Sequence, residues 1–275
     1  MNKIGFIGFG AMGGIMVEAM VKNRAIQAGK IVLHTRTPAK MKSFLERYPA
    51  AETAENIKDL AGKCSRVFIC TGTKEVKAVL EELAGYLPEN AHIITITGII
   101  EMKCLESVFG GAITRIMPTQ IAEVGEGVTL ILHNNKVAPG EREFIQKAFA
   151  KIGQVKEIRE SQMDVAADLA SCAPAFYAAI IKHVVTAAEK HGGMAANDIR
   201  EISVATAYGT LKLLLDKNIS FEELIKRVAT PGGITEEGVK ILGRALPDVF
   251  GEVLTTTLAK REKLRKQMRE QYGIS

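Results

Sequence analysis

The first half of the chain alternates short apolar, β-branched runs with stretches in which apolar residues recur at helical spacing. The short runs predict strands at residues 3–8, 30–34, 66–70, 92–97, 112–117 and 128–133. The helical stretches lie between and after them, at residues 12–22, 39–47, 75–85 and 140–152. This alternation is typical of an α/β fold, in which helices cover both faces of a parallel sheet.

Beyond about residue 160 the strand signals nearly vanish and helical spacing takes over. Apolar side chains at spacings of three and four form one face of a long helix at Val165, Leu169, Cys172, Phe176, Ile180 and Val184. Further helices are predicted at residues 199–216, 221–229, 235–245 and 249–268. The pattern therefore predicts an α/β domain over residues 1–160 and an all-helical domain over residues 161–275, with no flexible linker between them.

The composition is that of an ordinary globular protein, because 47% of the 275 residues are hydrophobic and 24% are charged. The formal net charge of +5 comes largely from one basic segment at residues 260–270, which disfavours nucleic acid as a partner. The most apolar stretch, residues 170–188, contains Pro174, Lys182 and His183. We therefore expect a buried core helix there and no membrane as a partner. No secretory signal is recognised, so we expect a cytoplasmic protein.

Cysteine and histidine spacing argues against a metal site. The four cysteines lie far apart at Cys64, Cys70, Cys104 and Cys172 and form no CxxC pair. A chain of this size needs no disulfide framework, so we interpret the cysteines as buried free thiols. The five histidines show no metal-ligand spacing either, and no metal is predicted.

The strongest local motif is G-x-G-x-x-G, which follows the first predicted strand and opens the first predicted helix. It comprises Gly8, Phe9, Gly10, Ala11, Met12 and Gly13. Gly8 allows the tight turn, Gly10 lets a pyrophosphate approach the backbone, and Gly13 lets the helix pack close to the strand. Free N–H groups at the start of the helix favour that anion. The motif predicts a Rossmann-type dinucleotide-binding domain, with a purely structural glycine-rich turn as the alternative.

The end of the second predicted strand bears on the choice of cofactor. NAD-specific sites usually carry Asp or Glu there to bind the ribose 2′-hydroxyl. This chain has Thr35, Arg36 and Thr37 instead. A guanidinium can pair bidentately with a 2′-phosphate, so NADP is favoured over NAD. A solvated loop charge is the alternative for Arg36.

Five segments resemble the pyrroline-5-carboxylate reductase family. Residues 228–235 read V-A-T-P-G-G-I-T, which resembles the V-x-S-P-G-G-T-T signature of that family. Residues 3–13 are similar to the start of the family, and residues 97–99 (T-G-I) to its A-G-I turn. Residues 115–118 (R-I-M-P) resemble its R-V-M-P, and residues 125–129 its G-x-G-M-T. The resemblance runs along nearly the whole chain.

The resemblance implies an NAD(P)H-dependent oxidoreductase that reduces the C=N bond of L-Δ1-pyrroline-5-carboxylate to give L-proline, in proline biosynthesis. It also implies an intertwined homodimer built by the helical domain, sometimes assembled into a pentamer of dimers. Because the cofactor supplies the hydride, the protein has to hold the substrate carboxylate and place the imine carbon C5 over the nicotinamide.

The resemblance and the local chemistry together give the candidate substrate site. Two glycines, Gly232 and Gly233, permit backbone N–H groups to converge on the carboxylate. Thr230 keeps the hydroxyl of the family's serine, and Thr235 adds a hydroxyl at a helix N-terminus. We expect Thr235 to be catalytic and the other three to bind substrate with it, against the alternative of a plain Pro-Gly-Gly turn. Cys172 stands where the family has serine and is either a substrate contact or a small core residue.

The same resemblance extends the candidate cofactor set beyond the glycine motif and residues 35–37. Thr71 lies in the loop that borders the adenosine end of the cofactor, Gly98 lies in the T-G-I turn, and Pro118 ends the R-I-M-P segment. These three residues are expected to contact NADP(H) or NAD(H).

Three segments depart from the family pattern. Residues 170–176 read A-S-C-A-P-A-F in place of S-G-S-G-P-A-Y, Thr119 replaces an asparagine, and residues 70–74 replace A-V-K-P. Three alternatives therefore stay open: a reductase of another imine, a β-hydroxyacid-type dehydrogenase, and a nucleotide-binding paralogue with a regulatory role. The dehydrogenase is disfavoured because no lysine lies near Pro174, where its acid–base group would be needed.

Overall fold

The computed structural model describes residues 3–274 and divides the chain into two compact units. The first unit, called the sheet unit below, comprises the chain up to Cys172 together with the residues from Thr257 onward. The second, called the helical unit, comprises Ala173–Thr256. The predicted order of an α/β domain and an all-helical domain is confirmed by this architecture.

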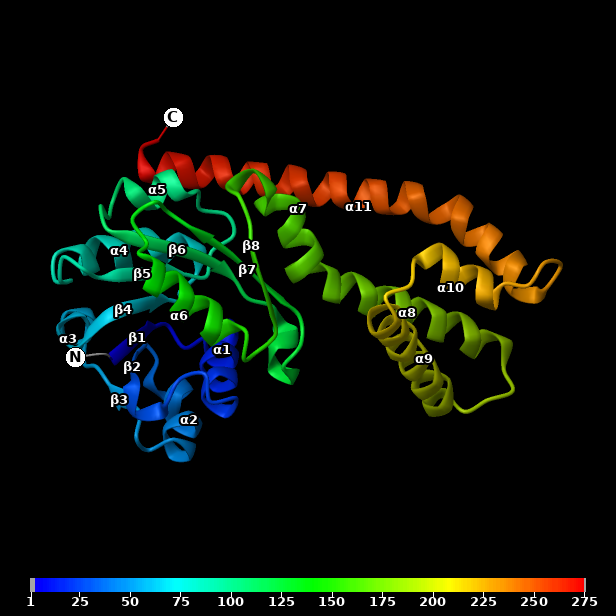
Figure 1. Cartoon of the computed structure of the whole chain (residues 1–275), viewed down its shortest axis with the longest axis horizontal. Coiled ribbons are helices and arrows are strands. Elements are labelled where there is room, and N and C mark those ends of the chain that lie inside the picture. Colours follow the sequence, from blue (N-terminus) through cyan, green and yellow to red (C-terminus); the bar gives the residue numbers. More distant parts are fainter. Residues whose placement is uncertain (1–2, 275) are drawn as a thin grey trace. The chain divides into compact units, whose positions relative to one another are not determined.

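The sheet unit is built on eight strands in the order β3-β2-β1-β4-β5-β6-β7-β8 (Figure 1). Their bounds are β1 Lys3–Ile7, β2 Ile31–His34, β3 Glu52–Thr53, β4 Cys64–Ile69, β5 His92–Thr95, β6 Ala112–Met117, β7 Val128–His133 and β8 Gln154–Glu157. Neighbouring strands are parallel except for β6 and β7, which are antiparallel. The order reverses at β1, so the carboxyl end of β1 is the topological switch point at which open α/β sheets bind ligands.

The helices of the sheet unit connect these strands. Their bounds are α1 Ala11–Lys22, α2 Lys42–Arg47, α3 Ile57–Lys63, α4 Val76–Ala84, α5 Met102–Glu106, α6 Pro139–Phe149 and α7 Met163–Ala167. Short 3-10 turns lie at η1 Ala28–Lys30, η2 Pro38–Met41, η3 Thr73–Glu75, η4 Gln120–Val124 and η5 Glu160–Gln162, and a π-turn lies at η6 Asp168–Cys172. The strands β3 and β8 and the helices α3 and α5 were not predicted from the sequence.

The core of the sheet unit lies on both faces of the sheet because successive side chains of a strand point to opposite faces. Phe6 and Phe68 stack with ring centroids 4.7 Å apart on the face covered by α1, α2 and α6. Ile7 and Val67 lie on the other face with buried residues of α3, α4 and α5. This double layer confirms the expectation of helices on both faces.

The reversed direction of β7 corrects the expectation of a fully parallel sheet. A parallel connection needs a crossover of a dozen or more residues, usually a helix. Only residues 118–127 join β6 to β7, and they contain the short turn η4. The chain therefore turns back and pairs Ile116 with Ile131 in antiparallel register.

The last part of the chain returns to the sheet unit. The end of helix α11 (Ile234–Tyr272) lies beside α5 (Figure 1), and its residues Met268 and Tyr272 are buried in the same core as Leu105. Arg269 Nε donates to Glu101 Oε2 at 2.5 Å, and this contact lowers the pKa of the Glu101 carboxyl. The boundaries of the two compact units therefore differ from those of the predicted domains 1–160 and 161–275. The residues from Thr257 onward pack with the sheet unit and are part of it.

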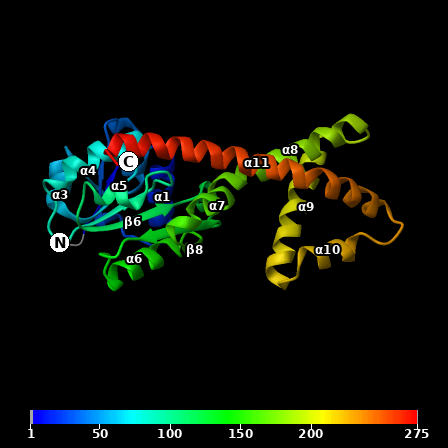
Figure 2. The same ribbon diagram turned by 90° about the horizontal axis from the view of Figure 1, so that it is seen from above.

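The helical unit contains α8 Ala173–His191, α9 Ala196–Lys217, α10 Phe221–Val228 and the first part of α11. Helices α8 and α9 pack against each other (Figure 2). Two helices were predicted at residues 235–245 and 249–268, but a single helix continues through Pro247. Among the residues of this unit, all of which the structure describes, Ala173 and Ile199 are buried.

This low burial corrects the expectation that residues 170–188 form a buried core helix. Along α8, Tyr177, Ile180 and Val184 are exposed. The helical stretch Glu160–His191 is long and apolar enough to cross a membrane by length and composition, and 17% of its most apolar window is buried within the chain. The apolar pattern was correctly recognised, but the described residues of this chain leave most of that apolar face exposed.

Candidate functional site

The glycine motif forms a tight turn between β1 and α1. Gly8 has φ +95°, and a Cβ there would lie 2.7 Å from the carbonyl oxygen of Cys70. A Cβ on Gly13 would lie 2.8 Å from the carbonyl oxygen of Gly8. Only glycine fits both positions, because the backbone after β1 lies against the backbone after β4 at Gly8 and against the start of α1 at Gly13. Neither contact leaves room for a Cβ atom. The predicted tasks of Gly8 and Gly13, a tight turn and close helix packing, are in agreement with this geometry.

Gly10 lies in different surroundings. It caps the N-terminus of α1, no side chain caps that helix, and nothing lies within 4 Å of the position that its Cβ would take. The first N–H groups of α1 therefore face open space beside a backbone that a ligand can approach closely. This is the arrangement that binds a phosphate or pyrophosphate at a helix N-terminus.

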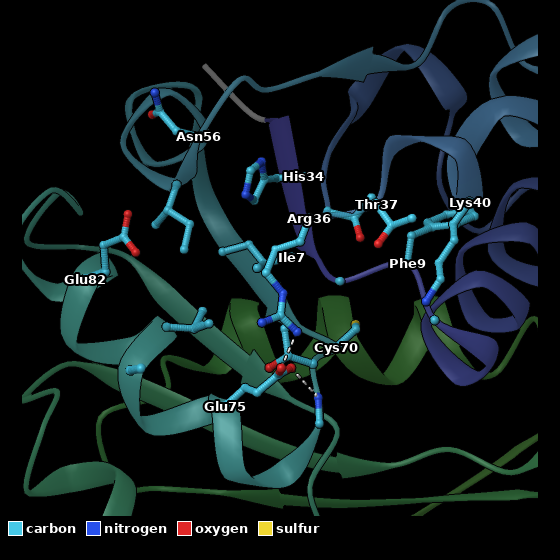
Figure 3. A pocket seen from close by; sticks show the side chains of 18 of the residues that line it. Ile7, Phe9, His34, Arg36, Thr37, Lys40, Asn56, Cys70, Glu75 and Glu82 are labelled. Carbon is cyan, nitrogen blue, oxygen red and sulfur yellow. Dashed lines mark hydrogen bonds and ion pairs between the residues drawn. The ribbon is translucent and has the colours of Figure 1, made fainter.

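A cavity of approximately 600 Å³ opens beside this turn, at the carboxyl ends of β1, β2 and β4. Seven of the residues predicted to bind cofactor line it: Gly8, Phe9, Gly10, Thr35, Arg36, Thr37 and Thr71. Figure 3 shows Arg36, Thr37 and Phe9 around the cavity. Ala11, Met12 and Gly13 do not line it and belong to the helix start behind the turn.

Thr71 provides the test of whether this cavity fits a polar cofactor. Its hydroxyl oxygen is buried and finds no hydrogen-bond partner among the residues that the structure describes. A buried hydroxyl without a partner is costly, and a ligand in the cavity can supply the missing hydrogen bond. With the open N–H groups at Gly10, the donors present fit a dinucleotide. The expected contacts of its pyrophosphate with the glycine turn and of its adenosine end with residues 35–37 and Thr71 stay predictions.

Gly98 and Pro118 follow β5 and β6, at the same edge of the sheet as the glycine turn. A Cβ on Gly98 would lie 1.7 Å from Met117 Cε, so a side chain at that position would displace Met117. Arg115 is buried and fixes the turn, since its Nη2 donates to the carbonyl oxygen of Gly98 at 3.2 Å. An ion pair with Glu160 balances the charge of this guanidinium.

Cys172 ends the π-turn η6 and contacts a buried polar cluster. Arg261 Nη2 lies 3.3 Å from its Sγ and 2.7 Å from Oδ1 of the buried Asp168. Asp168 also accepts a hydrogen bond from the Thr257 hydroxyl at 2.5 Å. Burial raises the pKa of the Cys172 thiol, which therefore stays protonated near neutral pH and is not an activated nucleophile. The predicted choice between substrate contact and core residue stays a prediction.

The Pro-Gly-Gly turn lies in the helical unit, between α10 and α11. Gly232 has φ +74°, and Gly233 N–H donates to the carbonyl oxygen of Thr230 at 2.9 Å. Gly232 N–H donates to Glu236 Oε2 at 2.8 Å. Both glycine N–H groups thus have partners within the chain. Thr235 lies in the first turn of α11, where helix N–H groups lack helical partners.

Sequence reasoning missed several polar residues of the cofactor cavity: His34, Lys40, Asn56, Lys74, Glu75 and Glu82. Glu75 is the most informative, because it pairs with Arg36 inside the cavity (Figure 3). It stands three residues after Gly72, and its Oε2 accepts from Gly72 N–H at 3.2 Å. A G-x-x-E pattern after a strand is a weak local signal for this turn, but it does not indicate contact with a residue 39 positions earlier.

Comparisons with known proteins assign both halves of the chain. Residues 160–264 match the family model for pyrroline-5-carboxylate reductase dimerisation. Residues 3–104 match the model for the NAD binding domain of 6-phosphogluconate dehydrogenase. The helical unit thus lies within a dimerisation domain, and the cofactor cavity lies within an NAD-binding domain.

Individual relatives match along nearly the full length. The chain is 32% identical to pyrroline-5-carboxylate reductase 3 of Bacillus subtilis, over 98% of this chain and all of that protein. It is 26% identical to ComE operon protein 4 of the same organism, over 99% of this chain and all of that protein. The structure of a Plasmodium falciparum pyrroline carboxylate reductase with NADP bound shares the fold, with a TM-score of 0.81, 22% identity and coverage of 96% and 97%. The chain therefore belongs to the pyrroline-5-carboxylate reductase family.

Proposed function

We propose that this protein reduces L-Δ1-pyrroline-5-carboxylate to L-proline with a hydride from NADPH or NADH, as a step of proline biosynthesis. The observation that carries the proposal is the full-length match to a relative named pyrroline-5-carboxylate reductase. Both parts of the chemistry have candidate residues: the glycine-turn cavity for the cofactor and the Thr230–Thr235 turn for the substrate.

The cofactor, when bound, supplies the hydride that adds to C5 of the cyclic imine, while the nitrogen carries a proton taken from water. The tasks of the protein are therefore binding and orientation. Gly8, Gly10 and the start of α1 hold the pyrophosphate, and Thr35, Arg36 and Thr37 hold the adenosine ribose. Gly98 and Pro118 contact the cofactor further along the same edge of the sheet.

The substrate carboxylate is held by the first turn of α11. Because Gly232 N–H already donates to Glu236 and Gly233 N–H to Thr230, the donors left for a ligand are the Thr235 hydroxyl and the first N–H groups of the helix. The positive end of the helix dipole favours an anion there. We assign the orientation of the imine to Thr235, with Thr230, Gly232 and Gly233 shaping the turn and Cys172 as a further substrate contact.

The predicted domain over residues 161–275 serves substrate binding and dimerisation in this proposal. Exposed apolar side chains are spread over its helices, for example Tyr208, Leu215 and Phe221, and a second copy of the chain is the partner that buries them. The physiological unit is then a homodimer or a larger homo-oligomer, with no membrane and no nucleic acid as partner. We place this enzyme in the cytoplasm.

The test is turnover of pyrroline-5-carboxylate by the purified full chain with NADPH, followed by the nicotinamide absorbance. We expect Thr235→Ala to lower kcat/KM by about a hundredfold, the scale for loss of one preorganised hydrogen-bond donor. Thr255→Ala is the matched control, because Thr255 is an exposed threonine of the same helix. NADPH binding without any turnover of the imine would refute the proposal and favour a regulatory paralogue.

A further inference from the structure

Two oppositely charged side chains meet in the cofactor cavity from segments that follow separate strands. Arg36 follows β2 and Glu75 ends the turn after β4, with β1 lying between these strands. Arg36 Nη2 pairs with Glu75 Oε1, and Figure 3 shows the guanidinium directed across the cavity toward this carboxylate. The second carboxylate oxygen accepts from Gly72 N–H at 3.2 Å.

The two members of this pair are held unequally. The side chain of Arg36 is 81% exposed and that of Glu75 is 39% exposed. An ion pair at this exposure is weak, because water screens it and two side chains must be ordered to form it. Arg36 can therefore exchange Glu75 for another anion at little cost, whereas the bond from Gly72 keeps Glu75 in the cavity.

The two forms of the cofactor differ at the adenosine ribose, where NADPH carries a 2′-phosphate and NADH a 2′-hydroxyl. A phosphate gains a charge-assisted contact with Arg36, but it has to replace the Glu75 carboxylate and then remain near a like charge. A hydroxyl can donate to a carboxylate, which is the task of the Asp or Glu in NAD-specific sites. Arg36 thus favours NADPH, and Glu75 opposes it and favours NADH.

We propose that Arg36 and Glu75 form a single selectivity element that lets this chain accept both cofactors. Glu75 is the ribose-binding acid that the end of β2 lacks, supplied from the neighbouring turn after β4. The inference rests on the cofactor site of the proposed function and deepens it, because it assigns the balance between NADPH and NADH to one pair of residues.

The experiment measures cofactor binding to the full chain without any imine, by calorimetry with NADPH and NADH. Adenosine 2′,5′-bisphosphate and adenosine 5′-monophosphate serve as probes that lack the nicotinamide. The variant is Glu75→Gln, which removes the charge and keeps an oxygen that can accept from Gly72. The matched control is Glu82→Gln, which removes a carboxylate that lines the same cavity and is not the partner of Arg36.

We expect Glu75→Gln to lower the Kd for NADPH about threefold and to raise the Kd for NADH about threefold, the scale of one screened charge and one hydrogen bond at a partly exposed site. The bisphosphate should follow NADPH because it carries the 2′-phosphate, and the monophosphate should follow NADH because it carries the 2′-hydroxyl. Arg36→Gln should weaken NADPH about tenfold and leave NADH within twofold.

The inference is overturned if the NADPH-to-NADH ratio of Kd values in Glu75→Gln equals that of the wild type or that of Glu82→Gln. It is also overturned if the wild type binds neither cofactor. If the wild type binds both cofactors and Glu75→Gln shows the expected shift in the ratio, but the wild type does not reduce pyrroline-5-carboxylate, the proposed function is refuted and the selectivity element stays in place.

Discussion

The sheet unit and the helical unit use their apolar residues in opposite ways. In the sheet unit, apolar side chains of strands and helices meet on both faces of the sheet, and residues such as Phe68 and Leu80 are fully buried. In the helical unit, Ala173 and Ile199 are the buried residues, while Tyr208 is 69% and Leu215 is 74% exposed. The sheet unit closes its own core, whereas the helical unit presents apolar surface to a partner.

The difference follows from geometry. A sheet with helices on both faces is a three-layer structure in which each apolar face already has a neighbour. An amphipathic helix without such a neighbour exposes its apolar face, and soluble proteins rarely leave large apolar patches exposed unless another molecule covers them. The comparison therefore predicts that changes in the helical unit alter assembly and that changes in the sheet unit alter folding and cofactor binding.

The largest effect is expected from Tyr208→Glu on α9. A charge buried without a partner in an interface costs several kcal/mol, and a symmetric dimer carries the change twice. We expect association to weaken more than about a thousandfold, measured by light scattering coupled to size exclusion. Tyr86→Glu is the matched control, because Tyr86 is 48% exposed in the sheet unit. The comparison fails if both variants keep the wild-type mass.

Met268→Ala tests whether the end of α11 belongs to the core of the sheet unit. Met268 is buried beside α5, and truncating a buried methionine costs about 2–5 kcal/mol. We expect a loss of about 3 kcal/mol in the free energy of unfolding in urea. Gln267→Ala should have almost no effect, because the neighbouring Gln267 is exposed. Equal losses in the two variants would contradict the packing of this segment.

Gly10→Ala and Gly13→Ala separate ligand access from folding within one motif. A methyl at Gly13 meets the backbone of Gly8, whereas a methyl at Gly10 points into open space. We expect Gly13→Ala to destabilise the fold by about 1–3 kcal/mol. Gly10→Ala should fold normally and weaken NADPH about tenfold, because the methyl occupies the approach of the pyrophosphate. Thermal unfolding measures the stability of both variants, and calorimetry measures their affinity for NADPH. A Gly10→Ala protein with unchanged affinity for NADPH would show that Gly10 is not part of the cofactor site.

The last prediction concerns the pH dependence of stability. The Thr114 hydroxyl lies 2.7 Å from His92 Nε2 and 2.6 Å from His133 Nδ1. Burial, helped by the charge of Arg142, lowers the pKa of His133 to about 4. Between pH 6.5 and 4 the unfolded chain then binds more protons than the folded chain, so stability falls as the pH falls. This histidine alone contributes on the order of 2 kcal/mol across that window.

The check is urea unfolding at several pH values. His133→Gln keeps a hydrogen-bonding side chain and cannot titrate, so it should flatten the loss of stability toward pH 4. His191→Gln should keep the wild-type slope, because His191 is exposed in the helical unit. A wild-type slope in His133→Gln would show that this histidine is not coupled to folding.

Local sequence determined the elements with strong periodicity. The ranges predicted for β6 and β7, residues 112–117 and 128–133, coincide with the observed strands. The strand β3 has two residues and no apolar one, and Val155 is the one apolar residue among the four of β8. Neither strand carries an apolar run or an alternating pattern, and both were missed. Their formation depends on an available neighbouring edge, β2 for one and β7 for the other.

The glycine motif shows what sequence by itself could decide about the site. Gly8 and Gly13 are required by contacts with residues close in the chain or in the adjacent strand, so a spacing pattern is enough to recognise the turn. The basic residue after β2 was recognised in the same way. The acid at Glu75 was not, because its meeting with Arg36 depends on the order of β2, β1 and β4 in the sheet.

The sequence alone thus determined the α/β then all-helical order and the position of the cofactor turn, since both depend on local spacing. The family was recognised from the resemblance of several short motifs. Tertiary structure decided the reversal of β7, the return of Met268 and Tyr272 to the first core, and the pairing of Arg36 with Glu75. Contacts of this kind join residues far apart in the chain, and their energies depend on which surfaces meet after folding. Neither the periodicity nor the motifs of the sequence indicate which of these surfaces meet.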